Sequence, residues 1–114
     1  MICVELETMI CGLVKAGLIE ARAYHQNETF AAAVRFARSE GIIPAPEPAH
    51  AIRAVIEEAS GGESNTILFG LCGHGHFDLA AYDAYLAGEL EDPEFSTQEM
   101  EEALSRLPEA PALA

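Results

Sequence analysis

Apolar side chains recur at helical spacing in four stretches of the first ninety residues. The spacing predicts helices over residues 2–16, from Asn27 to just before Gly41, from the prolines near position 46 to Gly61, and from Asp78 to Gly88. Asn27 and Asp78 suit helix N-caps, and a glycine follows each stretch, as is typical of helix ends. The apolar positions that define the stripes are Leu6, Met9, Ile10, Leu13, Phe30, Ala33, Val34, Ala37, Ile52, Val55, Ile56, Ala59, Leu79, Tyr82 and Leu86.

Two other stretches have the shorter period or the β-forming residues of strands. Residues 18–24 alternate loosely between apolar and polar side chains, and residues 66–71 form a short run rich in β-formers. Residues 42–46 should be extended, because each proline disfavours helical geometry in the residue before it. Strands that alternate with helices predict an α/β fold, a partial three-layer sheet-and-helix domain that is helix-rich, with two to three short strands in a partly parallel sheet.

The pattern changes after residue 90. Residues 91–114 hold seven acids and one arginine, yet Ser96 and Glu99 form a capping box. Met100, Leu104 and Leu107 then give the expected helix an apolar stripe, which ends before Pro108. We therefore expect one α/β unit over residues 1–90 and an acidic helical extension over 91–114 with a loose end.

Charge and cysteine usage narrow the class of protein. The 114 residues carry 19 acidic and 6 basic side chains, a formal charge of −13. Such a field repels phosphates, which argues against nucleic acid and anionic membranes as partners. No apolar run reaches the roughly 20 residues that span a bilayer. The N-terminus does not resemble a secretory signal, and three cysteines are an odd number, so we expect a reduced, cytoplasmic protein.

Residues 67–78 (ILFGLCGHGHFD) concentrate the candidate chemistry. Cys72, His74 and His76 could supply three ligands to a tetrahedral zinc ion, although their spacing matches none of the common zinc patterns. Cys72 could instead be a nucleophile activated by the following helix start. The alternative interpretation is that Gly73 and Gly75 permit a tight turn, with a buried cysteine and ordinary loop histidines.

Glu47 is a second candidate, since it lies where a proline-rich segment becomes a helix. A carboxylate in a first helical turn is favoured by the helix dipole, which is the structural explanation of most such acids. Its rigid placement between Pro46 and Pro48 also suits a group that must face a ligand. His50, one turn later, is expected to be packed or to support its neighbours rather than to catalyse.

Three segments together resemble a known family. Residues 21–26 (ARAYHQ), 40–52 (EGIIPAPEPAHAI) and 71–78 (LCGHGHFD) occur in the order found in the C-terminal segment of a tryptophan synthase β chain. The resemblance is to the longer chains of this family, which act without a tight α-subunit partnership. It runs from about Leu13 to about Leu107, and the second and third motifs are specific to the family.

The resemblance implies part of a fold-type II pyridoxal phosphate enzyme, a lyase that makes L-tryptophan from L-serine and indole. Glu47 matches the glutamate that lies against the cofactor ring, and Cys72 matches the serine that pairs with the pyridine nitrogen. Gly73 and His74 match loop residues at the edge of the cofactor. Gly70 replaces a common asparagine, which puts the local turn in doubt.

Other elements of the family's site have no counterpart here. The Schiff-base lysine and the phosphate-binding loop lie upstream of the matched part, and Lys15 does not match the former. The resemblance therefore implies no catalytic residue in this chain, which we expect to be inactive alone. Its partner is expected to be the complementing upstream half of the enzyme or further copies of itself. The alternatives are a free-standing homo-oligomeric binding or structural module and a small zinc protein.

Overall fold

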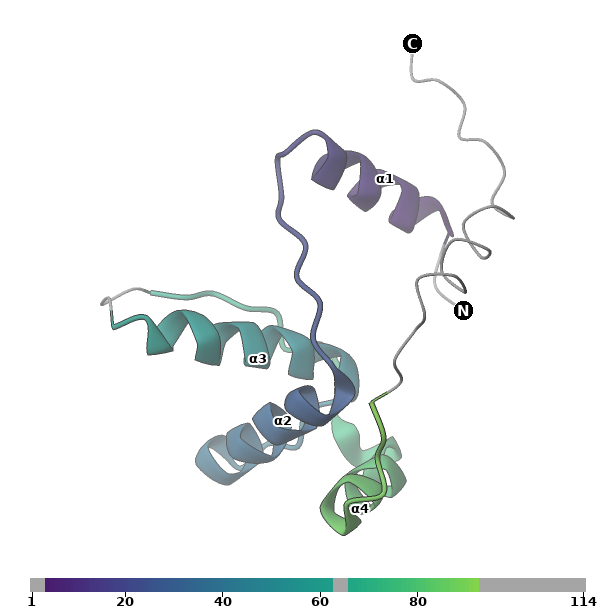
Figure 1. Cartoon of the computed structure of the whole chain (residues 1–114), viewed down its shortest axis with the longest axis vertical. Coiled ribbons are helices and arrows are strands. Elements are labelled where there is room, and N and C mark those ends of the chain that lie inside the picture. Colours follow the sequence, from purple (N-terminus) through teal and green to yellow (C-terminus); the bar gives the residue numbers. More distant parts are fainter. Residues whose placement is uncertain (1–3, 63–65, 93–114) are drawn as a thin grey trace.

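The computed structural model describes residues 4–62 and 66–92, which form four α-helices and one short 3-10 helix (Figure 1). The α-helices are α1 (Val4–Lys15), α2 (Gln26–Glu40), α3 (Pro46–Ser60) and α4 (Leu79–Ala87), and η1 (Gly75–Phe77) precedes α4. All four predicted helices of this region are confirmed. The acidic helix predicted over residues 96–107 lies outside the described residues.

Glycines end three of these helices through a left-handed backbone. After α1, the Gly17 N–H donates to the Val14 carbonyl at 3.0 Å and the Leu18 N–H donates to the Leu13 carbonyl at 3.0 Å. This paired pattern requires a positive φ at the glycine, and Gly17 has φ 69°. Gly41 and Gly88 end α2 and α4 with similar φ values of 72° and 73°. The stops predicted at these glycines are confirmed.

The predicted N-cap of α2 is wrong by two residues. His25 occupies the cap, and its backbone N–H donates to the Glu28 carboxylate at 2.9 Å. This bond joins the N-cap backbone to the third residue of the helix and so places the helix start ahead of Asn27, which lies in the first turn. The Asn27 N–H instead donates to the Asp92 carboxylate at 3.0 Å, and the Asn27 side chain donates to the Leu90 carbonyl at 3.0 Å. A residue 65 positions away therefore completes the cap.

We expect Asp92→Ala to destabilise the protein at neutral pH and to matter less in acid. The N–H of Asn27 holds the pKa of the Asp92 carboxyl below its usual value, and His25 contributes in the same direction. The pKa of Asp92 is lower in the folded state than in the unfolded state. The stabilisation is therefore complete at pH values above the unfolded-state pKa, and it is lost as the pH falls through the folded-state pKa. Urea unfolding at several pH values measures it, with exposed Asp83→Asn as the control. A pH-independent difference between wild type and variant would contradict this role.

The described residues contain no β-strand, so the predicted strands over 18–24 and 66–71 are not formed there. An extended segment becomes a strand only when a neighbour pairs with its backbone. The described residues supply one isolated antiparallel bridge, between Pro44 and His74. The helix-rich part of the fold prediction is confirmed, whereas the sheet is not seen in this part of the chain.

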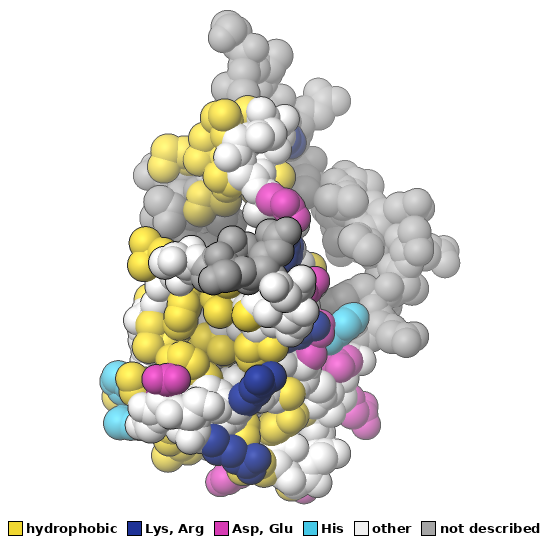
Figure 2. Space-filling view, turned by 90° about the vertical axis from the view of Figure 1, so that its left-hand side faces the viewer, with side chains coloured by type: hydrophobic (Ala, Val, Ile, Leu, Met, Phe, Trp, Pro, Cys, Tyr) yellow, Lys and Arg dark blue, Asp and Glu magenta, His cyan; other side chains and the backbone are white. Residues whose placement is uncertain are grey.

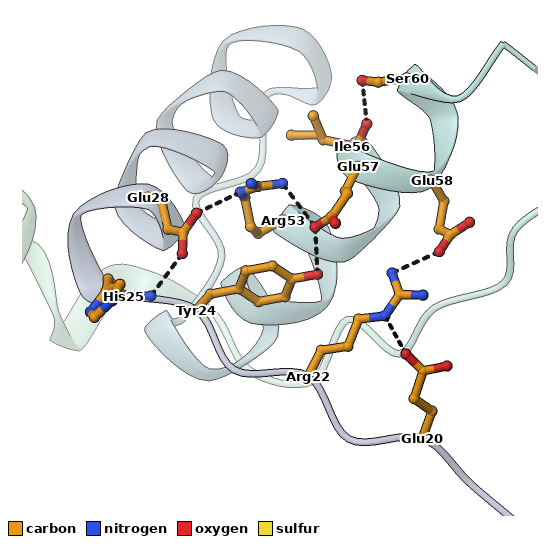
Figure 3. A network of polar contacts seen from close by, with 10 residues as sticks. All are labelled: Glu20, Arg22, Tyr24, His25, Glu28, Arg53, Ile56, Glu57, Glu58 and Ser60. Atoms are coloured by element: carbon orange, nitrogen blue, oxygen red, sulfur yellow. Dashed lines mark hydrogen bonds and ion pairs between the residues drawn. The ribbon is translucent and has the colours of Figure 1, made fainter. Parts of the chain in front are cut away.

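Side chains, rather than backbone bonds, hold residues 20–25 against α3 (Figure 3). Arg22 pairs with Glu58 at 2.7 Å, and the Tyr24 hydroxyl donates to Glu57 at 2.9 Å. Arg53 lies 5.0 Å from the centre of the Tyr24 ring and also pairs with Glu28 of α2 at 3.1 Å. The hydrogen bonds that the Arg22 guanidinium makes with Glu58, Tyr24 and Glu20 raise the pKa of Arg22, which stays charged. The network joins the segment before α2 to both helices.

The core lies where α2, α3 and α4 meet. Phe30 packs edge-to-face on Tyr82, with ring centres 5.0 Å apart, and stacks on Tyr85 at 5.7 Å. Ala33 and Ala49 are buried in the same cluster and let the helices approach closely. The stripe predicted for α4 is only partly confirmed, because Tyr82 is buried whereas Leu79 and Leu86 are exposed.

Much apolar surface stays uncovered by the described residues, and apolar side chains gather on one face of the molecule (Figure 2). Leu68 is 97% exposed and Phe77 is 91% exposed. A soluble monomer of this size rarely exposes so many large apolar side chains together. No helix within 4–62 and 66–92 has both the length and the apolar character to cross a membrane.

Candidate functional site

The second and third motifs of the resemblance, residues 40–52 and 71–78, are in direct contact. The Gly75 N–H donates to the Ile43 carbonyl at 2.8 Å, beside the Pro44–His74 bridge. The Tyr82 hydroxyl donates to the Pro44 carbonyl at 2.6 Å. Burial raises the pKa of Tyr82, with Asp78 adding to the effect, so the phenol keeps the proton that it donates. We call this set of contacts, made by Ile43, Pro44, His74, Gly75 and Tyr82, the clasp.

Gly75 is the residue on which the clasp depends. A Cβ at this position would lie 2.5 Å from the Pro44 carbonyl oxygen, 2.8 Å from Ile43 Cγ2 and 3.0 Å from Tyr82 Cε2. Gly75 is buried, and its φ is not positive, so the need for glycine is steric. The sequence prediction assigned no site role to Gly75, Pro44 or Tyr82. The sequence signal that could have indicated this close contact was the pair of glycines at positions 73 and 75.

The predicted cofactor residues Glu47 and Cys72 flank the contact between the two loops. Glu47 comes after the contact in the first loop, and Cys72 comes before it in the second. Glu47 is exposed in the first turn of α3, directly after Pro46. Cys72 is an exposed free thiol. A Cβ on Gly73, which has φ 84°, would lie 3.2 Å from the Ala45 Cβ. The structure thus brings together the segments that carry Glu47 and Cys72, and the expectation of a buried cysteine is wrong.

His74 and His76 lie against each other at the surface. Their ring centres are 4.7 Å apart, and the His76 backbone N–H donates to His74 Nδ1 at 3.4 Å. The exposed Phe77 ring is 5.5 Å from His74. His50 is exposed rather than packed, and its Nδ1 lies 3.1 Å from the Pro46 carbonyl oxygen. Where the structure describes the chain, no three His, Cys, Asp or Glu side chains are grouped closely enough to hold a metal ion.

The donor set fits the ring of pyridoxal phosphate better than its phosphate. Among described residues, the Glu47 carboxylate and the Cys72 thiol make no side-chain hydrogen bond and are exposed, so they are free to contact a polar heterocycle. Neither residues 40–52 nor residues 71–78 contain lysine or arginine to bind a dianion.

The cavities described in this structure lie elsewhere. One of about 290 Å³ opens between α2 and α3, where Phe36 meets Phe69 edge-to-face with ring centres 6.1 Å apart. Another, of about 330 Å³, lies between α2 and α4 beside Ile43. Neither is lined by Glu47, Cys72, Gly73 or His74. The predicted site residues form an open surface in the described part of the chain.

Comparison with known proteins gives a consistent set of relatives. No family model matches the chain. It is 59% identical over 88 residues to tryptophan synthase beta chain 2 of Aquifex aeolicus, a match that covers 74% of this chain and 20% of that protein. It is 58% identical to tryptophan synthase beta chain 2 of Methanosarcina mazei, and that match covers 73% of this chain and 20% of the relative. It is 55% identical to the tryptophan synthase beta chain of Pyrococcus horikoshii, and that match covers 72% of this chain and 19% of the relative.

The chain therefore spans about one fifth of the length of the relatives that it matches. The resemblance stated from the three motifs is confirmed by these identities, which extend over nearly three quarters of the chain. The matched residues are a segment of the tryptophan synthase beta chain family.

Proposed function

We propose that this chain supplies one wall of a pyridoxal phosphate site that makes L-tryptophan from L-serine and indole. The observation that carries the proposal is the clasp, which joins the two family-specific motifs through the Gly75–Ile43 and Tyr82–Pro44 hydrogen bonds. It fixes the start of α3 against the loop at Cys72 and leaves Glu47 and the thiol exposed on those segments. Family names of the relatives support the same reaction.

In this proposal each predicted residue has a distinct role at the cofactor. The Cys72 thiol acts as a weak hydrogen-bond partner of the pyridine nitrogen, which keeps that nitrogen unprotonated. Glu47 lies against the ring near the reacting amine, and Gly73 and His74 line its edge. When bound, pyridoxal phosphate provides the electron sink for the replacement reaction. A thiol rather than a carboxylate at the nitrogen keeps that sink modest.

The proposal also holds that the chain is inactive alone and is completed by the upstream part of the enzyme. Its carboxylate and thiol offer contacts to the ring, whereas the lysine and phosphate loop of the family have no match among its residues. The exposed apolar side chains of residues 66–79 are consistent with a missing neighbour. After unbound pyridoxal phosphate is removed by gel filtration, this chain alone should therefore retain no absorption band of an internal aldimine.

Complementation tests the proposal directly. The purified 114-residue chain, mixed with an upstream fragment of a tryptophan synthase beta chain, should form tryptophan from L-serine and indole when pyridoxal phosphate is present. We expect Glu47→Gln to lower this turnover, because a neutral amide would replace the carboxylate that lies against the cofactor ring near the reacting amine. The matched control Glu89→Gln changes an exposed acid beyond α4 and should leave turnover unchanged.

Two further measurements separate the outcomes. If Cys72 faces the cofactor, complementation should protect its thiol from a reagent such as dithionitrobenzoate, whereas the exposed Cys11 of α1 serves as the unprotected reference. Single-cysteine variants identify which thiol reacts. Turnover no higher than that of either fragment alone, with no protection of Cys72, would contradict the proposal.

A further inference from the structure

Tyr82 of α4 touches both of the loops that carry the predicted cofactor residues, although it lies outside all three motifs of the resemblance. Its hydroxyl donates to the Pro44 carbonyl at 2.6 Å, and its ring lies against Gly75, where an added Cβ would come within 3.0 Å of Cε2. Phe30 packs edge-to-face on the same ring at 5.0 Å, and Tyr82 is 6% exposed. The packing of the ring therefore holds the hydroxyl in one direction.

The start of α3 has no side-chain cap of its own. Ala45 occupies the N-cap, and its methyl group makes no hydrogen bond to the first turn. Pro44, directly before this cap, has a fully buried side chain and accepts the bond from Tyr82. The hydroxyl of Tyr82 thus supplies from α4 a fixing contact that the residues beside the helix start lack.

The prolines carry the position of Pro44 on to Glu47. Pro44 and Pro46 each have a fixed φ, and Ala45 between them is restricted because a proline follows it. Glu47 comes next, in the first turn of α3. With so little freedom in the connection, a shift of the Pro44 carbonyl is passed on to the Glu47 backbone.

We propose that Tyr82 is a positioning residue, whose hydroxyl sets, through Pro44, where Glu47 lies relative to the loop of Cys72. It acts through the backbone rather than by contact with the cofactor. Its effect on turnover rests on the proposed function, whereas its hold on the start of α3 is a property of the chain alone. The two parts are therefore measured separately.

Tyr82→Phe removes the hydroxyl and keeps the ring on which Phe30 packs. The Pro44 carbonyl then loses its donor, which favours its movement toward another one. Tyr85→Phe is the matched control, because Tyr85 lies on the same helix and stacks on Phe30 at 5.7 Å. The clasp takes its hydroxyl bond from Tyr82 and not from Tyr85.

Hydrogen exchange of the chain alone tests the hold on α3. The N–H of Gly75 bonds across the clasp, and that of Ala49 bonds within the first turn of α3. We expect Tyr82→Phe to speed exchange at both amides roughly two- to tenfold, the range for loss of one hydrogen bond. The amide of Ala33, in the core of α2, should change less, and Tyr85→Phe should not favour the clasp amides over it.

Complementation with the upstream fragment gives the second measurement. Tyr82→Phe should lower kcat about tenfold and leave KM for L-serine near that of wild type, because the reacting group is misplaced while the binding contacts remain. Tyr85→Phe should keep both values. Far-UV circular dichroism at the assay temperature verifies that the two variants are folded to the same extent as wild type.

Equal acceleration at Gly75, Ala49 and Ala33 would overturn the proposal, since Tyr82 would then stabilise the whole fold without holding the start of α3 in particular. Unchanged exchange at all three amides would overturn it too, and so would equal kcat values for Tyr82→Phe and Tyr85→Phe when wild type is active. If wild type itself forms no tryptophan, the proposed function is rejected, and amide exchange alone decides whether Tyr82 holds α3.

Discussion

Gly75→Ala should destabilise the protein by about 2–3 kcal/mol, because the added methyl group has no room in the clasp. Its Cβ would lie 2.5 Å from the Pro44 carbonyl oxygen, a backbone atom that moves only if the start of α3 moves too. Displacing Pro44 would also break the 2.6 Å hydrogen bond from Tyr82. Urea denaturation followed by far-UV circular dichroism gives the change in the free energy of unfolding.

Gly70→Ala is the matched control for this experiment. A Cβ on Gly70 meets no atom within 4 Å, and its φ is not positive, so the added methyl group is accommodated. We expect a change near zero, or a slight stabilisation through the unfolded state. If Gly75→Ala prevents folding, Tyr82→Phe removes only the hydrogen bond to Pro44 and gives a graded reading of the same contact. Equal effects of Gly75→Ala and Gly70→Ala would show that the clasp is not sterically tight.

Phe30→Ala should cost about 3–5 kcal/mol, the range for removing a buried aromatic ring. Phe30 is 6% exposed and is the ring on which both Tyr82 and Tyr85 of α4 pack. Its loss should therefore detach α4 from α2 and leave a cavity among small residues that include Ala33. A marginally stable protein would unfold near room temperature as a result.

Phe77→Ala supplies the comparison, because the same side chain is removed from a site that is 91% exposed. We expect a change of less than about 0.5 kcal/mol, as is usual for surface substitutions. The two free energies of unfolding come from the same denaturant titration. A loss at Phe77 as large as the one expected at Phe30 would mean that Phe77 is buried by an association in solution. A loss at Phe30 as small as the one expected at Phe77 would mean that the core does not centre on Phe30.

Local signals in the sequence predicted the helices well. The apolar stripes and the glycines at 17, 41 and 88 placed the helices and their C-terminal ends, because both depend on residues within one or two turns. The start of α2 was misplaced at Asn27, because the helix begins at Gln26 and its N-cap is His25. Glu28 favours His25, and the distant Asp92 bonds to Asn27. That second contact has no local signature.

The strand predictions failed for a different reason. Residues 66–71 have the composition and alternation of a strand, but a ladder needs a second segment that the described residues do not provide. The candidate site was predicted as residues on two loops, and the structure joins those loops. The atoms that join them, the Gly75 N–H and the Tyr82 hydroxyl, belong to residues whose roles depend on tertiary contact alone.

The clasp also closes the chain into a loop. Because Pro44 bridges His74, residues 45–73 leave and return to the same place, with α3 between the two ends. Tilting α3 at its first turn would stretch the Gly75–Ile43 bond and shift the Cys72 segment with it. A ligand whose binding shifted one of these segments would therefore change the affinity of the other segment for its own ligand, and by linkage the effect would be equal in both directions. The segments that carry Glu47 and Cys72 thus share one contact, although the two residues are 25 positions apart in the sequence.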